Sequence, residues 1–392
     1  MNATAVLPPA PVERRRSSAL RIFICHPSAL LTDHRANGDG LLAHRMILEL
    51  ARRGHEIDVA TAAIDCAIPF PPNVRVHVLA PVSSREWLDR AAYALRVRAL
   101  FERLNRRQRF DLVHQLNPVA TGLSLGLAGC GVPVILGPYV GYWPGSQRPL
   151  ARLGLRIASW LQQRLAAAFI LATPAAISRI AARRHARSRT HVIPYGIDLA
   201  SFPAQPPKAE GHVVIFLAAT SWRKGIFTLL DAVALLRRTM PDLEVIVAGG
   251  GWEYDAMSAR IERDGLGEIV RMAGFVPRQD VPALLARGNV YCLPSFGEPY
   301  GMTAIEAMAC ARPVVATNAG GLASLVDSEG GRLVPSGDAA ALAAALDEIL
   351  RDPALAARMG AHNRRRVEES YAWPAVIDSL EAAYSTVLEA RC

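Results

Sequence analysis

Short apolar runs alternate with longer amphipathic stretches along most of the chain. In the first half the apolar runs cover residues 21–26, 57–61, 75–79, 111–114, 133–136, 169–173 and 191–194. In the second half they cover residues 213–217, 243–248, 269–273, 290–293, 313–316 and 332–334. Continuous apolar strands of this kind are typical of parallel sheets that are buried on both faces by helices. The pattern therefore predicts an α/β fold built from doubly wound parallel sheets.

Between most of these runs, apolar residues recur at helical spacing. The predicted helices cover residues 41–53, 87–104, 150–165, 226–238, 303–309, 339–350 and 373–388. Strands and helices form two series, separated at 201–211 by a proline-containing segment that is typical of a linker. A chain of 392 residues is long enough for two such domains. We therefore expect two Rossmann-like domains, at 19–200 and 211–370, that face a central cleft. The Pro- and Arg-rich residues 1–18 are expected to be a disordered lead-in.

Charge is distributed unevenly between the two predicted domains. Residues 1–200 hold 26 Arg and 12 acidic residues, a net charge of +14. Residues 201–392 hold 18 basic and 23 acidic residues, a net charge of −5. Arg accounts for 42 of the 44 basic residues, so the basic balance partly reflects a general preference for Arg. The aromatic residues do not alternate with the Arg clusters, and we predict no nucleic-acid partner.

The six cysteines are scattered and form no Cys-x-x-Cys pair. This spacing favours neither a zinc site nor a disulfide framework, and it fits a reducing, cytoplasmic location. The uncharged run 123–147 is interrupted by glycines and prolines, so we expect no transmembrane helix. The chain has no Asp-x-Asp pair that could hold a metal ion against a diphosphate, and we expect no metal ion and no cofactor.

The segment 295–308 carries the strongest candidate chemistry. It leads from an apolar run into a predicted helix, so the N–H groups near Gly301 lie at a helix N-terminus, which favours an anion. Glu298 lies in the loop before this helix, and Glu306 lies about one turn inside it. Carboxylates accept hydrogen bonds from hydroxyl groups, so the segment suits a ligand with a phosphate flanked by sugars. The alternative is that Glu298 caps the helix and Glu306 is a solvated surface residue.

The second candidate is Arg223-Lys224-Gly225, in the turn between the apolar run 213–217 and a helix. Lys224 is one of two lysines in the chain, and its place before a glycine at a helix start suits a compact, flexible cation. Lysine binds phosphate as a point charge, whereas arginine offers a planar fork. The alternative is a solvated surface pair.

Gly38-x-Gly40 opens the predicted helix 41–53 and imitates part of a dinucleotide-binding fingerprint. In that fingerprint the glycines follow their strand at once, whereas here the strand ends near His26. A long loop more readily reaches over a cleft, where glycines let the backbone approach a phosphate. An NAD-dependent oxidoreductase is a weaker alternative, and an ordinary helix start is another. His114 ends a predicted strand and is either a group that meets substrate or a satisfied core histidine.

The string from Glu298 to Ala309 resembles the E-x7-E motif of retaining GT-B glycosyltransferases of family GT4. The likeness extends through residues 223–225, 193–198, 274–276 and 313–317, and it covers most of the chain. The resemblance implies a GT-B fold and a metal-independent, retaining transfer of a sugar from a nucleotide-diphosphate sugar. It also implies that the last helix, 373–390, crosses back onto the N-terminal domain, which would bind the acceptor.

The resemblance also assigns site residues. It implies that Glu298 holds the donor sugar, that Glu306 holds the ribose, and that Lys224 stabilises the leaving diphosphate. The implied set is Glu298, Lys224 and Arg223 as catalytic groups, with Gly38, Gly40, Tyr300, Gly301, Met302, Glu306, Phe275 and Val276 as further donor contacts. His114 is the acceptor-side candidate.

Some positions depart from the family pattern. Leu217 and Ala218 stand where an Arg often precedes the lysine, and Ser324 stands where a Glu often follows the double glycine. Gly137-Pro138 occupies the place of a frequent acceptor-side His. These departures concern the acceptor side more than the donor side, and a non-catalytic nucleotide-sugar binder stays open as an alternative.

The expected partners are a UDP- or GDP-sugar donor and a glycan or lipid-linked acceptor. The basic N-terminal half contains two basic amphipathic stretches, 85–110 and 148–165, which predict contact with an anionic membrane face. The alternative is that each apolar stripe packs its helix on its own sheet. We therefore expect a cytoplasmic enzyme of polysaccharide synthesis that lies peripherally on the inner face of the membrane.

Overall fold

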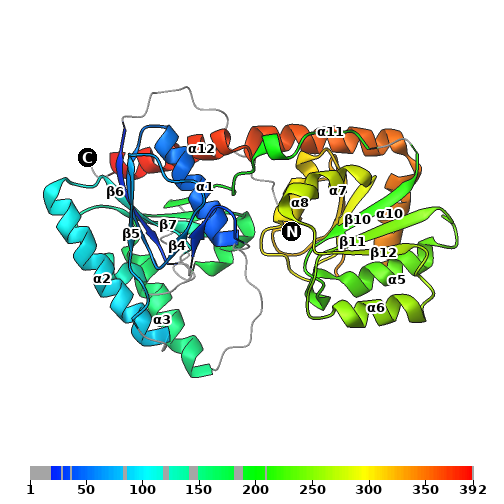
Figure 1. The fold of residues 1–392 in the computed structure, drawn as a ribbon, viewed down its shortest axis with the longest axis horizontal. Helices are drawn as coiled ribbons and strands as arrows, with labels where there is room; N and C mark the ends of the chain where they lie inside the picture. The colour runs from blue at the N-terminus through cyan, green and yellow to red at the C-terminus, as the bar shows by residue number, and fades with distance from the viewer. Residues whose placement is uncertain are drawn as a thin grey trace.

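The computed structural model describes residues 19–27, 30–35, 38–82, 86–117, 123–140, 149–180, 189–207 and 210–390. The expected lead-in at 1–18 lies outside these residues. The described chain forms two large parallel sheets, one in each half of the molecule, and both are covered by helices (Figure 1). The predicted α/β class with two Rossmann-like sheets is therefore confirmed.

The N-terminal sheet has seven strands in the order β5-β3-β1-β6-β7-β8-β9, and all neighbours are parallel. The strands are β1 (Arg21–His26), β3 (Glu56–Thr61), β5 (Val74–Val78), β6 (Leu112–Gln115), β7 (Val134–Tyr139), β8 (Ala168–Leu171) and β9 (Thr190–Val192). A separate short pair joins β2 (Leu31–Thr32) to β4 (Ile64–Asp65). Every residue of β1, β6 and β8 is buried, as expected for strands covered on both faces.

The C-terminal sheet has six strands in the order β12-β11-β10-β13-β14-β15, again all parallel. The strands are β10 (His212–Leu217), β11 (Leu243–Ala248), β12 (Val270–Gly274), β13 (Val290–Leu293), β14 (Val314–Thr317) and β15 (Gly331–Val334). The chain lays down β10, β11 and β12 in one direction and then returns to the other side of β10. The order of the strands therefore reverses between β10 and β13, which is where such sheets bind ligands.

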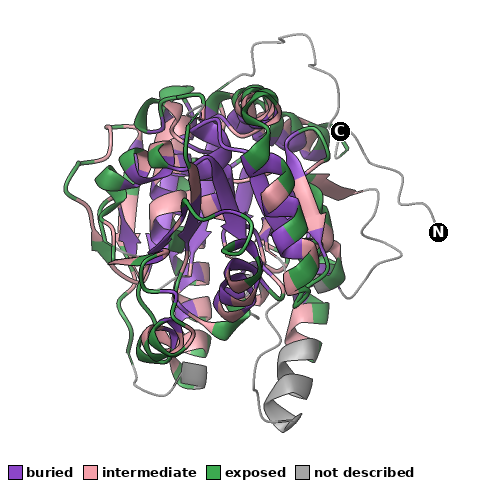
Figure 2. Cartoon of the chain, turned by 90° about the vertical axis from the view of Figure 1, so that its right-hand side faces the viewer, coloured by how far each residue is buried: buried purple, intermediate pink, exposed green. Residues whose placement is uncertain are grey.

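The described helices cover both faces of the two sheets, and the buried residues lie on the strands and the inner helix faces (Figure 2). They are α1 (Gly38–Arg52), α2 (Glu86–Arg107), α3 (Pro149–Leu165), α5 (Ile226–Leu236), α6 (Tyr254–Arg263), α7 (Val281–Arg287), α8 (Met302–Ala309), α9 (Leu322–Leu325), α10 (Ala339–Arg351), α11 (Pro353–Ser370) and α12 (Trp373–Glu389). Four of these, α6, α7, α9 and α11, were not among the predicted helices. Among the described helices, none combines the length and the apolar character that a membrane span requires.

Helix α12 leaves the C-terminal half and packs on the N-terminal domain, where it contacts α1 (Figure 1). Trp373 and Tyr384 are buried in the same hydrophobic core as β1 and α1. A Cβ atom on Gly196 would lie 2.3 Å from the Trp373 ring, so the glycine makes room for this contact. On the surface, Arg53 pairs with Asp378 at 2.7 Å. The last helix thus ties the two halves together beside the linker, where the Ile197 N–H donates to the Tyr371 carbonyl at 2.8 Å and Arg364 donates to the Phe202 carbonyl at 2.7 Å.

Candidate active site

The loops after β10 and β13 lie side by side because the two strands are neighbours in the sheet. The Phe296 N–H donates to the Arg223 carbonyl at 2.8 Å, and the Ser295 hydroxyl donates to the same carbonyl at 2.9 Å. The two segments with the strongest candidate chemistry therefore form one surface at the point where the strand order reverses.

Gly225 sets how closely these two loops approach. It has φ +78°, in the left-handed region, and it forms the junction between the short 3₁₀ turn Trp222–Lys224 and helix α5. A Cβ atom at this position would lie 1.8 Å from the Pro294 carbonyl oxygen. A side chain at residue 225 would therefore push the lysine loop away from the glutamate loop.

Gly225→Ala is expected to lower the free energy of unfolding by about 2–4 kcal/mol, from backbone strain and overpacking together. Gly267→Ala is the matched control, because Gly267 has open space around it and no positive φ. That control should change stability by less than about 0.5 kcal/mol. Urea denaturation of both variants measures the difference, and equal stability of the two variants would contradict the steric argument.

Lys224 and Glu298 meet on this surface. The Lys224 Nζ lies 2.5 Å from Glu298 Oε2. The two side chains are 22% and 10% exposed, so the pair is mostly shielded but still reaches solvent. Arg223, the third predicted catalytic residue, is exposed on the same turn, with its guanidinium 5.7 Å from the centre of the Trp222 ring. A cation next to a carboxylate at this edge of the sheet can bind both a phosphate and a hydroxyl group.

The backbone of Glu298 is held by the double glycine that follows β14. Gly321 N–H donates to the Glu298 carbonyl at 2.7 Å, and a Cβ atom on Gly320 would lie 2.2 Å from the same oxygen. Gly301, with φ +97°, then turns the chain into α8. The first N–H groups of α8 consequently begin four residues after Glu298, at a helix N-terminus that favours an anion.

Glu306 lies inside α8 and is buried, with 4% of the residue exposed. Its Oε1 accepts a hydrogen bond from Arg278 Nη1 at 2.7 Å. Burial raises the pKa of the Glu306 carboxyl, and the charge of Arg278 opposes that rise. Sequence reasoning did not single out Arg278. Its position four residues after Gly274, in a strand-to-helix turn of the same sheet, was the available signal.

The remaining donor candidates divide into two groups. Phe275 follows β12 and is 77% exposed, while Val276 and Met302 are half-buried. Tyr300 is different, because its side chain turns away from this surface toward the N-terminal half. Its hydroxyl accepts from the Tyr195 N–H at 2.7 Å and donates to the Tyr195 carbonyl at 3.2 Å. Tyr300 can therefore contribute its backbone to the donor loop, while its side chain joins the two domains.

In the N-terminal domain, the Gly38–Gly40 segment does not form the loop that the sequence predicted. Helix α1 begins at Gly38, so both glycines belong to its first turn. Gly40 is buried, and a Cβ atom there would lie 2.3 Å from the Leu30 carbonyl oxygen. Gly40 thus serves close packing of the helix on the preceding segment, whereas Gly38 is exposed and has open space around it.

His114 is fully buried, and its Nδ1 lies 2.7 Å from the Tyr384 hydroxyl on α12. It also lines a small cavity of about 30 Å³ together with His26, Asp39 and Asn117. Burial lowers the pKa of both His26 and His114 to about 4, so both imidazoles are neutral at physiological pH. At this cavity Asn117 donates to Asp39 at 2.7 Å. His114 is therefore a core histidine that also lines the cavity beside α1.

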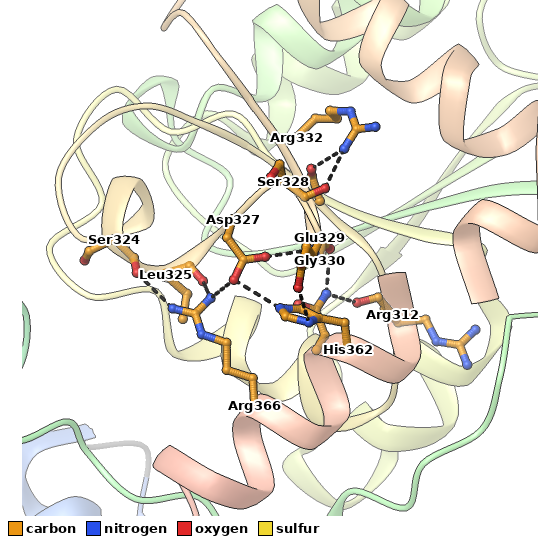
Figure 3. Close-up of polar contacts among 12 residues, drawn as sticks. Arg312, Ser324, Leu325, Asp327, Ser328, Glu329, Gly330, Arg332, His362 and Arg366 are labelled. Atoms are coloured by element: carbon orange, nitrogen blue, oxygen red, sulfur yellow. Dashed lines mark hydrogen bonds and ion pairs between the residues drawn. The ribbon is translucent and has the colours of Figure 1, made fainter. Parts of the chain in front are cut away.

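Behind the double glycine, a polar network braces the chain against α11 (Figure 3). Asp327 accepts from Arg366 at 3.0 Å and pairs with His362 at 3.1 Å, and these contacts help to lower the pKa of its carboxyl against the effect of burial. Arg366 also donates to the Ser324 carbonyl at 3.1 Å, and the Ser324 hydroxyl donates to the Gly321 carbonyl at 2.9 Å. Ser324, which departs from the family pattern, thus supports the loop that holds Glu298.

Comparison with protein families gives matches over both halves of the chain. Residues 36–201 match the model described as "Glycosyltransferase Family 4". Residues 200–366 match the model described as "Glycosyl transferases group 1". The two matches meet at the linker between the two sheets.

Individual relatives give the same result. The chain is 26% identical to an MMP alpha-(1->4)-mannosyltransferase from Mycolicibacterium hassiacum, over 90% of this chain and 95% of that protein. It is 35% identical to a phosphatidyl-myo-inositol mannosyltransferase from Mycobacterium leprae, over 50% of this chain and 53% of that protein. Among solved structures, Anabaena HepE in complex with UDP and glucose superposes with a TM-score of 0.68 at 22% identity, over 94% of this chain and 100% of that chain.

The fold and the site together define a GT-B glycosyltransferase. The two family matches, which together run from residue 36 to residue 366, and the named relatives show that the chain is a GT4-like glycosyltransferase.

Proposed function

We propose that the enzyme transfers a sugar, with retention of anomeric configuration, from a nucleotide-diphosphate sugar to a glycan or lipid-linked acceptor. The observation that carries the proposal is the contact between Lys224 and Glu298 at the reversal of strand order, beside the N-terminus of α8. A cation that binds phosphate and a carboxylate that binds hydroxyl groups lie at one place. Together they suit a sugar diphosphate better than a sugar or a phosphate alone.

In this proposal the donor lies along the carboxyl edge of the C-terminal sheet. Lys224, Arg223 and the amides of residues 300–302 bind the diphosphate and stabilise its charge as the bond to the sugar breaks. Glu298 accepts hydrogen bonds from the donor sugar. Glu306 accepts from the ribose, which competes with its present contact to Arg278. Phe275 and Val276 lie beside the base. No side chain is assigned as a covalent nucleophile.

The relatives support a nucleotide-sugar donor. HepE was solved with UDP and glucose, and the mycobacterial relatives are named mannosyltransferases. Either a UDP-sugar or a GDP-sugar is consistent with these names. The phosphatidyl-inositol acceptor named for one relative favours a lipid-linked acceptor, which would approach from the N-terminal domain and a membrane on the cytoplasmic side.

A thermal-shift screen of UDP-, GDP- and ADP-sugars tests the donor. A ligand that binds the folded protein raises its apparent stability in proportion to RT ln(1 + [L]/Kd). Sugars of one nucleotide are expected to raise Tm. The enzyme should then consume that donor, and NMR should show that the new linkage keeps the anomeric configuration of the donor. Inversion of configuration would contradict the retaining assignment. Donor binding without hydrolysis or transfer would favour the alternative of a non-catalytic binder.

The NAD-dependent alternative rested on Gly38 and Gly40, and the structure favours it less. Helix α1 includes both glycines in its first turn, and β1 ends at His26 with β2 between them, so Gly38 and Gly40 do not form a turn that leads directly from a strand into a helix. NAD should therefore give no shift in the same thermal screen.

Activity is expected to persist in excess EDTA. Lys224, Arg223 and the N-terminus of α8 supply positive charge where the diphosphate is proposed to bind, which is the stabilisation that a bound cation supplies in other transferases. The initial rate with EDTA should lie within about twofold of the untreated rate, a difference of less than ~0.5 kcal/mol in barrier height. A complete loss that Mg²⁺ or Mn²⁺ restores would show that a metal ion carries the diphosphate chemistry.

A further inference from the structure

Among its described side chains, residues 157–165, helix α3 presents large apolar residues to solvent and buries two glutamines. Ile157, Trp160, Leu161 and Leu165 are 52%, 40%, 40% and 54% exposed. Gln162 and Gln163 are 2% and 1% exposed. Residues at spacings of three, four and eight share one face of a helix, so the four apolar side chains form a single outward stripe. We call this stripe the α3 apolar face.

The α3 apolar face is not part of the domain's own core. The two hydrophobic cores of the N-terminal domain, one built around β1 and α12 and the other around Phe23 and Phe101, include no described side chain of α3. The alternative that the stripe packs its helix on its own sheet is therefore wrong for the described side chains, residues 157–165. An exposed apolar stripe of this kind on a stable domain marks a surface that a protein partner or a membrane covers.

The one charged side chain among the described residues 157–165 of α3, Arg164, is positive. The sequence of α3 contains Arg152, Arg156 and Arg164 and has neither Asp nor Glu. The Arg164 guanidinium lies over the Trp160 ring, 4.8 Å from its centre, so apolar and basic groups are exposed together. A cavity of about 310 Å³ opens beside the end of the helix, and its lining includes Arg164, Leu165 and Arg189 but no acidic side chain.

We propose that α3 lies in the interface of an anionic lipid bilayer, with its apolar face among the acyl chains and Arg164 at the headgroups. A basic amphipathic helix gains both burial of apolar surface and attraction to anionic headgroups. Tryptophan favours this depth because its ring is apolar and its N–H can meet water or a headgroup. A protein partner would need acidic groups matched to each arginine, whereas an anionic bilayer supplies a continuous negative surface. A role of this membrane contact in delivering a lipid-linked acceptor rests on the proposed function.

Vesicle co-sedimentation tests the contact with the full chain. Vesicles of phosphatidylcholine alone are compared with vesicles of phosphatidylcholine mixed with phosphatidylglycerol. The protein is expected to bind the mixed vesicles at low salt and to bind them more weakly as salt rises, because exposed charges are screened over about 8 Å at physiological ionic strength. Failure to bind mixed vesicles at low salt would overturn the proposal.

Two variants and two matched controls locate the surface. The triple variant Ile157→Ser, Trp160→Ser, Leu161→Ser and the single variant Arg164→Glu are each expected to lower the partition onto mixed vesicles by at least about tenfold. Leu235→Ser and Arg238→Glu are the controls, since both residues are exposed on the C-terminal domain. Controls that weaken binding as much as the α3 variants would overturn the assignment to α3.

Two further measurements separate the other outcomes. The α3 variants should retain the Tm shift that a donor nucleotide produces, because α3 is not part of the proposed donor site. If the unaltered protein shows no Tm shift with any donor nucleotide, the proposed function is wrong, but the vesicle result still stands. Sedimentation equilibrium without lipid checks for a second copy on this face, and a dimer that the triple variant dissociates would overturn the membrane assignment.

Discussion

Replacing Glu298 with alanine is expected to lower kcat by at least about 10³-fold while the protein stays folded. The carboxylate is proposed to hold the donor sugar as the bond to the diphosphate breaks, so its loss affects the transition state more than donor binding. Donor affinity should change much less than kcat, because the lysine that now lies 2.5 Å from Glu298 would still face the diphosphate.

Glu268→Ala is the matched control for this experiment. Glu268 is an exposed glutamate of the same domain and contributes nothing to the proposed site, so its removal should leave kcat unchanged. The thermal unfolding midpoint and the circular dichroism spectrum of both variants show whether the fold persists. Near-normal turnover in Glu298→Ala would remove this residue from the catalytic set and with it the assignment of the site.

The second large effect is expected from Lys224→Ala. Loss of a charge-assisted hydrogen bond to the diphosphate should weaken donor binding by about 1.5–3 kcal/mol. This corresponds to a roughly 10- to 150-fold rise in the Kd measured by calorimetry. Lys224→Arg should recover part of this loss, since the charge returns but the planar guanidinium does not match the position of the ammonium group.

Lys224→Ala leaves the mostly shielded carboxylate of Glu298 without its partner, so the experiment needs a control for that effect. Removing one partner of such a pair leaves an uncompensated charge, which can lower stability without any role in binding. The double variant Lys224→Ala, Glu298→Ala removes both charges and should regain stability relative to Lys224→Ala. Its donor affinity should stay weak. If the double variant binds donor as well as the unaltered protein, the lysine acts on Glu298 and not on the diphosphate.

Most regular elements follow from local pattern. The apolar runs at 21–26 and 243–248 coincide with β1 and β11, and the long periodic segment at the end of the chain became α12. Helix α11 escaped prediction because its buried face includes Gly360 and Asn363. Asn363 there donates to the backbone carbonyls of Arg312 and Gly330, so a polar residue occupies a position that periodicity expects to be apolar.

The candidate site, too, could be predicted from the sequence only in part. Glu298 and Lys224 could be selected from the sequence because each follows an apolar strand and precedes a helix, and such turns gather at one edge of a parallel sheet. Their direct contact could not be predicted, because it depends on β13 returning to the side of β10. The contact of Arg278 with Glu306 and the turn of the Tyr300 side chain toward Tyr195 also depend on which loops the sheet order brings together.

By itself, the sequence determined the α/β class, most of the strands and the residue types from which a sugar-diphosphate site can be built, because these depend on spacing along the chain. It also determined that α3 carries an apolar and basic stripe. Only the tertiary structure decided which way that stripe faces, since the same periodicity fits a helix that packs inward or outward. In the folded domain Gln162 and Gln163 occupy the buried side. Packing with the rest of the domain sets the rotation of the helix, so Ile157, Trp160, Leu161 and Leu165 are left to solvent.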